Sequence, residues 1–162
     1  MSALDTWVDQ ISDWYQTRKH DQEKQLESLI LNVPEGVWGP NITDLQSKAI
    51  ACWLDGCLRI FQNARYQNPN RAFQFLQLAY SKLQMVVSVP SNELDLRDWC
   101  MKRMQHLAVL SLEFCNQQPH STWQEKSHHL IESHVQFMAM HAWNEPKQMD
   151  HRNYDQGNPS FH

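Results

Sequence analysis

The sequence predicts an all-α protein, an up-down bundle of about five helices with an N-terminal amphipathic helix and a disordered C-terminal tail. Apolar residues recur at the three- and four-residue spacing of a helix face in separate stretches. Several of these stretches begin behind a recognisable helix start signal. No stretch of useful length alternates apolar and polar residues as a half-buried strand would. With 162 residues, 41% of them hydrophobic, the chain is long enough to bury one substantial core.

The first predicted helix covers residues 1–31, and its front half is strongly amphipathic. Its apolar stripe consists of Leu4, Trp7, Ile11 and Trp14. A polar run over residues 17–25 interrupts this stripe, and Leu26, Leu29 and Ile30 then restore it. The helix is therefore expected either to break in the polar run or to project from the bundle.

Residues 32–41 predict a loop, because two prolines and two glycines surround Trp38. Thr43 then caps a second helix over residues 44–66, in which Asp55 and Arg59 form a favourable surface pair one turn apart. Gly56 lies on the apolar side of this helix, where another backbone is expected to approach closely. The apolar side consists of Leu45, Ala49, Cys52, Trp53, Gly56, Ile60 and Ala64.

The third predicted helix has the clearest start signal, Asn68 as cap and Pro69 at the first helical position. Its apolar face consists of Ala72, Phe73, Leu76, Ala79, Tyr80, Leu83, Val86 and Val87. A fourth helix is expected from residue 91 or 92 to residue 116. Its inward residues are Leu96, Cys100, Met104, Leu107, Ala108, Ser111, Phe114 and Cys115.

The fifth predicted helix begins behind Pro119 and runs to about residue 143, with Ser121 and Gln124 spaced as a capping box. Pro146 ends it. These elements predict one domain over residues 1–145, in which residues 43–145 form a four-helix core. Residues 1–31 then either cover the core or act as a partner or dimer arm, and residues 146–162 form a flexible tail.

Composition argues against several classes of protein. A net charge of −4 with 14 Lys plus Arg makes nucleic-acid binding unlikely. No apolar run reaches the roughly 20 residues that span a bilayer, so we expect a cytoplasmic protein, and its four cysteines are expected to be free thiols. Only four glycines occur, and they permit neither a Walker loop nor a dinucleotide fingerprint. We expect no cofactor and no catalysis, although a Cys–His nucleophile pair assembled in space stays open.

Histidine is abundant in the fifth helix, so a metal site must be weighed there. Glu125 and His128 have the Glu-x-x-His spacing of di-iron bundles, but helical geometry places them, with Glu132, on the solvent side. His134 and His141 instead lie in the apolar stripe. They predict, as an alternative function, a metal or haem site between the fourth and fifth helices, with Met104 or Cys100 as soft ligands. There are two other interpretations. In one, the histidines lie in the core with their hydrogen bonds satisfied; in the other, they gain a charge as the pH falls.

DNA binding is a further alternative, since Gln74, Gln77, Ser81 and Gln84 form a polar outer face on the third helix. Few cations accompany this face, so a solvated surface is the favoured interpretation.

Binding without catalysis remains, and two features point to it. The stripe of Trp7, Ile11 and Trp14 offers two tryptophans suited to docking a partner, unless the stripe simply closes the bundle. Leu78 and Met85 form an apolar pair on the otherwise polar side of the third helix, as an oligomer interface would. The sequence therefore favours a binding or regulatory protein that acts on a protein partner or on a second copy of itself.

Overall fold

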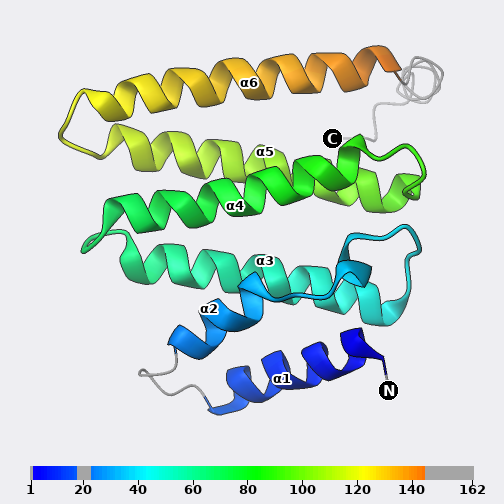
Figure 1. Ribbon diagram of the computed structural model, residues 1–162. Helices are drawn as coiled ribbons and strands as arrows, with labels where there is room; N and C mark the ends of the chain where they lie inside the picture. The colour runs from blue at the N-terminus through cyan, green and yellow to red at the C-terminus, as the bar shows by residue number, and fades with distance from the viewer. Residues whose placement is uncertain (1, 18–22, 145–162) are drawn as a thin grey trace, which may run out of the picture. The chain divides into compact units, whose positions relative to one another are not determined.

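The computed structural model describes residues 2–17 and 23–144, with the backbone alone at 142–144. These residues form helices and no strand, which confirms the all-α prediction and fits a helical bundle (Figure 1). The helices are α1 (Ala3–Thr17), α2 (Glu23–Leu31), the 3-10 turn η2 (Glu35–Trp38), α3 (Asp44–Ala64), α4 (Pro69–Ser88), α5 (Leu94–Asn116) and α6 (Thr122–Asn144).

Two compact units make up the chain, Met1–Val109 and Leu110–His162, with the boundary inside α5. The prediction of one domain over residues 1–145 stays a prediction, and the predicted tail at 146–162 lies outside the described residues. Among the described helices, none combines the length and the apolar character needed to cross a membrane.

Helix α3 is the centre of the first unit, where it contacts α1, α2, η2 and α4. In Figure 1, α4 runs along one side of α3, and α1 and α2 lie on the other side. The helix begins at the predicted cap, since the Thr43 hydroxyl accepts a hydrogen bond from the Gln46 amide (3.0 Å). Trp53 lies at the middle of the packed face, edge to face with Trp38 at 4.8 Å between ring centroids. Through this contact Trp38 holds the loop at residues 32–41 against α3, as the sequence predicted.

The first predicted helix is two helices in the structure. Helix α1 ends at Thr17 and α2 begins at Glu23, so the break between the two helices falls inside the polar run at residues 17–25. Both helices pack on α3 and on each other. The run carries no apolar side chain that could extend a buried face, whereas Leu26 and Ile30 restore one in α2 and are buried.

Gly56 does mark a close approach, but of side chains rather than of another backbone. A Cβ atom at this position would collide with the end of the Ile30 side chain and would lie 3.3 Å from Leu26 Cδ1. The missing side chain therefore lets α2 pack directly on α3.

Helices α4 and α5 keep the predicted faces. The Asn68 side chain caps α4 by accepting a hydrogen bond from the Arg71 amide (3.2 Å). Every predicted apolar residue of α4 except the half-buried Tyr80 is buried, as is every predicted inward residue of α5. Helix α5 starts later than predicted, at Leu94, because the Asn92 side chain is buried and donates to the Val86 carbonyl (2.8 Å) instead of capping.

The second unit contains the last turns of α5 and the helix α6. Phe114 and Trp123 pack edge to face, with ring centroids 5.4 Å apart, and both are buried. At the start of α6 the Gln124 amide donates to the backbone carbonyl of Ser121 (3.0 Å), not to its hydroxyl.

Candidate binding site

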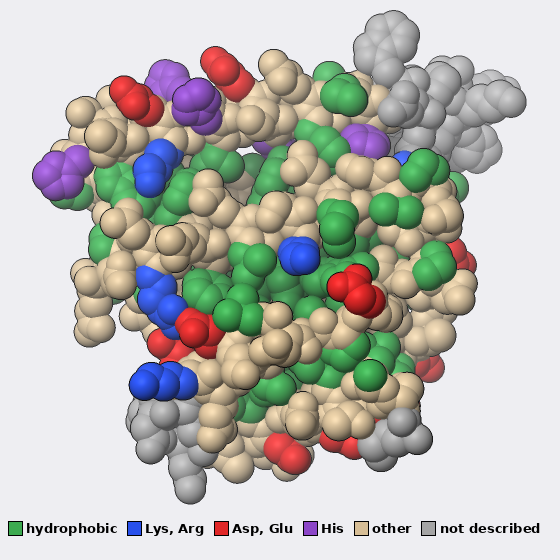
Figure 2. Space-filling model, in the orientation of Figure 1, with side chains coloured by type: hydrophobic (Ala, Val, Ile, Leu, Met, Phe, Trp, Pro, Cys, Tyr) green, Lys and Arg blue, Asp and Glu red, His purple; other side chains and the backbone are tan. Residues whose placement is uncertain are grey.

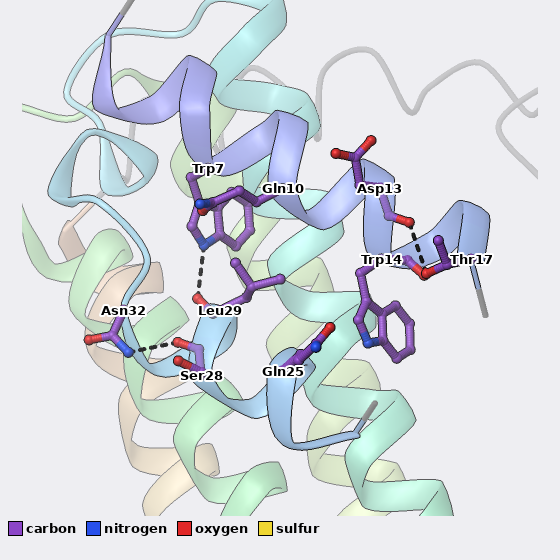
Figure 3. A pocket seen from close by; sticks show the side chains of 9 residues that line it. All are labelled: Trp7, Gln10, Asp13, Trp14, Thr17, Gln25, Ser28, Leu29 and Asn32. Carbon is purple, nitrogen blue, oxygen red and sulfur yellow. Dashed lines mark hydrogen bonds between the residues drawn. The ribbon is translucent and has the colours of Figure 1, made fainter. Parts of the chain in front are cut away.

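A groove of about 620 Å³ lies between α1 and α2. Its size falls within the range of small-molecule sites. Figure 3 shows the side chains that form its walls. The lining residues are Trp7, Gln10, Asp13, Trp14, Thr17, Gln25, Ser28, Leu29 and Asn32.

Two of the residues predicted to bind a partner are buried where α1 packs, and of the two only Trp7 lines the groove. Trp7 is 3% exposed and Ile11 is fully buried. The Trp7 indole N–H donates to the Leu29 carbonyl across the groove (2.8 Å), which ties α1 to α2. These two side chains close the bundle, the other outcome that the sequence left open. Whether they also bind a partner stays a prediction.

Trp14 is the one of the three predicted residues on α1 that remains accessible. It is half-buried, and Figure 3 shows its ring projecting from α1 into the space between the two helices. Its neighbour Tyr15 meets it edge to face, with ring centroids 5.3 Å apart. A large, amphipathic and partly exposed ring is the type of side chain that anchors protein interfaces.

A polar cluster on α3 fixes the end of α1 that carries Trp14. The Tyr15 hydroxyl donates to Asp55 Oδ2 (2.5 Å), and the same oxygen accepts from Arg59 Nε (2.8 Å). The Arg59 guanidinium also lies over the Tyr15 ring, 4.9 Å from its centroid. Burial, together with the hydrogen bond to Asp55, raises the pKa of Tyr15, so the phenol keeps its proton and remains the donor. The surface pair of Asp55 and Arg59 was predicted; the role of Tyr15 was not.

Helix α2 forms the other wall of the groove, and contacts with α3 and α4 hold it in place. Arg71 of α4 forms ion pairs with Glu27 and, at 3.3 Å, with Glu23. The Trp53 indole N–H donates to the Ile30 carbonyl at the end of α2 (3.0 Å). Both walls of the groove are therefore fixed to α3 or α4, so the groove exists before any partner arrives.

The groove has an acidic side. Helix α1 carries three aspartates, Asp5, Asp9 and Asp13, and neither lysine nor arginine. Asp13 is exposed and lines the groove. Two hydrogen bonds from Ser2 lower the pKa of Asp5, which keeps this carboxylate ionised.

Leu78 and Met85, the other predicted partner residues, lie on α4 and do not line the groove. Leu78 is half-buried, and Met85 is 42% exposed. Hydrophobic side chains reach the surface along α3 and α4 in Figure 2. The structure thus separates the two predicted partner surfaces, and the role of this second one stays a prediction.

The proposed metal ligands fall in both units. Cys100 and Met104 are fully buried in the first unit, and burial raises the pKa of the Cys100 thiol to about 12. Histidines are visible on the surface of α6 in Figure 2. His134 is half-buried, which lowers its pKa, and the His141 ring lies 4.2 Å from that of Phe137.

Within residues 2–17 and 23–144, no three His, Cys, Asp or Glu side chains are grouped to hold a metal ion. Glu125, His128 and Glu132 are exposed, as helical geometry predicted. The four cysteines are free thiols; Cys52 is half-buried and the other three are buried. Gln74, Gln77 and Ser81 are exposed and Gln84 is half-buried, which agrees with a largely solvated face.

The α2 wall is the part of the groove that sequence reasoning missed. Its contributors are Gln25, Ser28 and Leu29, with Asn32 directly after the end of the helix. The one available signal was the return of the apolar stripe at Leu26, Leu29 and Ile30, which indicates a second packed helix. Comparison with known proteins adds no assignment: no family model, no curated protein and no solved structure matches this chain.

Proposed function

We propose that the protein is a non-catalytic binding protein, whose α1–α2 groove receives an amphipathic helix of a partner protein. The observation that carries the proposal is the half-buried Trp14 in a groove between α1 and α2. Polar contacts attach α1 to α3 and α2 to α4. A helix of the partner would place an apolar side chain against Trp14 and Leu29, the mode of recognition in which a helix lies in a groove.

Charge specifies the partner further. Asp13 lines the groove and α1 has no basic residue, so a Lys or Arg beside the apolar face of the partner helix meets an opposite charge. Polar side chains such as Gln10 and Gln25 supply a rim that can hydrogen-bond to the partner. The partner is therefore a cationic amphipathic segment rather than an acidic one.

Binding of a defined pair of peptides to the full chain tests this proposal. One amphipathic helical peptide of Leu and Lys, as long as the 15 residues of α1, is compared with the same peptide carrying Glu for Lys. Fluorescence anisotropy is expected to detect binding of the Lys peptide only. Amide shifts in the NMR spectrum should change along α1 and α2.

Three variants separate groove binding from general attraction to an acidic protein. Trp14→Ala should weaken binding of the Lys peptide by about tenfold or more, because Trp is a frequent hot-spot residue. Met85→Ala, on the other apolar surface, should leave it unchanged. Asp13→Asn should reduce affinity by a few-fold, whereas Asp98→Asn on α5 makes the same change in net charge without that effect.

Several results would contradict the proposal. Equal binding of the Lys and Glu peptides, or full binding by Trp14→Ala, would exclude the groove as a site for a cationic helix. A dimer in analytical ultracentrifugation that dissociates in Trp14→Ala would show that the occupant is a second copy of the chain.

A further inference from the structure

A second, smaller cavity lies in the first unit, between the first turns of α3 and the first turns of α5. Its volume is about 210 Å³. The wall is mainly apolar, since Ile50 and Leu96 are buried there and Ile42 and Trp99 are half-buried. Among the described residues, Asp95 is the only charged one that lines the cavity, and its side chain is exposed. An apolar wall with one charged group is the usual composition of a small-molecule site.

Hydrogen bonds outside the cavity hold its two walls in place. The Ile42 amide donates to Glu93 Oε2 (2.6 Å), which joins the segment before α3 to the start of α5. The Arg97 guanidinium donates to the Val87 carbonyl (3.0 Å), which joins α5 to the end of α4. The cavity is therefore formed without a ligand, which lowers the cost of binding one.

Asp95 differs from the neighbouring acids in its lack of a partner. Asp98, one turn further along α5, pairs with Lys102 (3.2 Å), and Glu93 accepts the hydrogen bond from the Ile42 amide. The Asp95 carboxylate forms no hydrogen bond or ion pair with the part of the chain that the structure describes. Because it borders an apolar cavity, it can pair with a positive charge on a molecule bound there.

The charges around the cavity favour a cation. Residues 44–50 and 93–99 contain most of the wall, and they carry four carboxylates (Asp44, Glu93, Asp95 and Asp98) against two cations (Lys48 and Arg97). The N-termini of α3 and α5 add roughly half a positive charge each, which still leaves the surroundings negative. The Arg103 guanidinium lies over the Trp99 ring, 4.6 Å from its centroid, but it is two turns from Asp95, about 12 Å along the axis.

We propose that this cavity binds a small arylalkylammonium molecule, whose aromatic ring fills the cavity and whose positive charge pairs with Asp95. An apolar cavity of about 150 Å³ holds benzene, so the larger volume here admits a benzene ring with a short alkyl chain. The ring packs against Ile50, Leu96 and Trp99. An aromatic ring suits a wall that includes an indole, since aromatic pairs gain stability beyond the area that they bury. A neutral molecule would leave the carboxylate unpaired, and an anionic one would be repelled.

The amine 2-phenylethylamine and the alcohol 2-phenylethanol make a matched pair of probes, because they differ only in the ammonium or hydroxyl group at the end of the same chain. Titration of the full chain at neutral pH is followed by amide shifts in the NMR spectrum. The amine is expected to bind about fivefold more tightly, with shifts at Ser47, Ile50 and Leu96. About 1 M NaCl should remove most of this preference, because it shortens the Debye length to about 3 Å.

Variants of two aspartates test the role of the charge. Asp95→Asn keeps the shape of the side chain and removes its charge, so the two probes should then bind equally well. Asp98→Asn is the matched control, because it makes the same change in net charge one turn away and should keep the preference. A first-turn carboxylate also interacts favourably with the helix dipole, but that interaction changes stability and not the choice between the probes. Trp14→Ala, in the α1–α2 groove, should bind the amine as the unchanged protein does.

Filling the cavity tests where the ring binds. Ile50→Phe places a larger side chain in the wall, so neither probe should bind. If that variant fails to fold, Ser47→Phe at the exposed part of the lining is the second test, and it should weaken binding of both probes.

Four outcomes would overturn the inference. The amine could fail to bind at millimolar concentration, or it could bind no better than the alcohol. Its preference could survive in Asp95→Asn, which would mean that the charge pair does not form. Its shifts could also map to residues outside 42–50 and 93–99, which would place the molecule elsewhere.

Discussion

At the scale of single residues, Gly56 is where α2 comes closest to α3. Alanine favours a helix over glycine by about 1 kcal/mol, but here its Cβ would meet buried side-chain atoms of Ile30. Overpacking costs about 1–3 kcal/mol. We therefore expect Gly56→Ala to lower the free energy of unfolding by about 1–2 kcal/mol in urea denaturation.

A double-mutant cycle checks the cause of that loss. Ile30→Val removes the Cδ1 atom that the new methyl group would meet, so the double variant should be about 1 kcal/mol more stable than the sum of the single effects. Gly36→Ala is the matched control, because a Cβ atom there would lie 3.9 Å from Leu4 Cδ2, an ordinary contact. Additive effects of Gly56→Ala and Ile30→Val would refute the steric explanation.

At the scale of elements, one polar cluster attaches the end of α1 to α3. Tyr15→Phe removes the donor to Asp55 and should lower the free energy of unfolding by about 1 kcal/mol. Because Asp55 also pairs with Arg59, Asp55→Ala should cost somewhat more. Urea denaturation of the two single variants and the double variant should give a coupling energy of about 1 kcal/mol. A coupling near zero would mean that packing alone holds α1 on α3.

Local signals predicted the elements well where cap, proline and apolar face agreed. Helix α4 begins at its predicted cap, and the inward face of α5 was predicted in full. The failures have physical causes. The start of α5 depended on whether Asn92 caps the helix or reaches the Val86 carbonyl, and only tertiary structure decides between these bonds. The close approach at Gly56 was predicted, but its partner, Ile30, lies in another helix.

At the scale of the whole molecule, the candidate groove was only partly predictable. The spacing of Trp7, Ile11 and Trp14 placed them on one face, but their separation into buried and accessible residues depends on where α2 packs. The Gln46 side-chain oxygen, which has no hydrogen-bond partner among the described residues, gave no sequence signal at all. Its burial follows from the meeting of α3, η2 and α5 around it, and residue spacing within one helix cannot show such a meeting.

The central place of α3 predicts how the first unit opens. Since α3 contacts α1, α2, η2 and α4, its amides between residues 49 and 61 should exchange with solvent more slowly than those of α1 or α2. Trp53→Phe removes the donor to the Ile30 carbonyl and shrinks the contact with Trp38. Hydrogen exchange, followed by mass spectrometry, should then become faster in α2 and η2 but not in α4. The exchange rate should rise about tenfold for each ~1.4 kcal/mol by which the free energy of local opening falls. Trp99→Phe, on the half-buried α5 position, should leave exchange in α2 unchanged. An equal acceleration of α2 and α4 in Trp53→Phe would mean that α2 leaves α3 only when the whole unit unfolds.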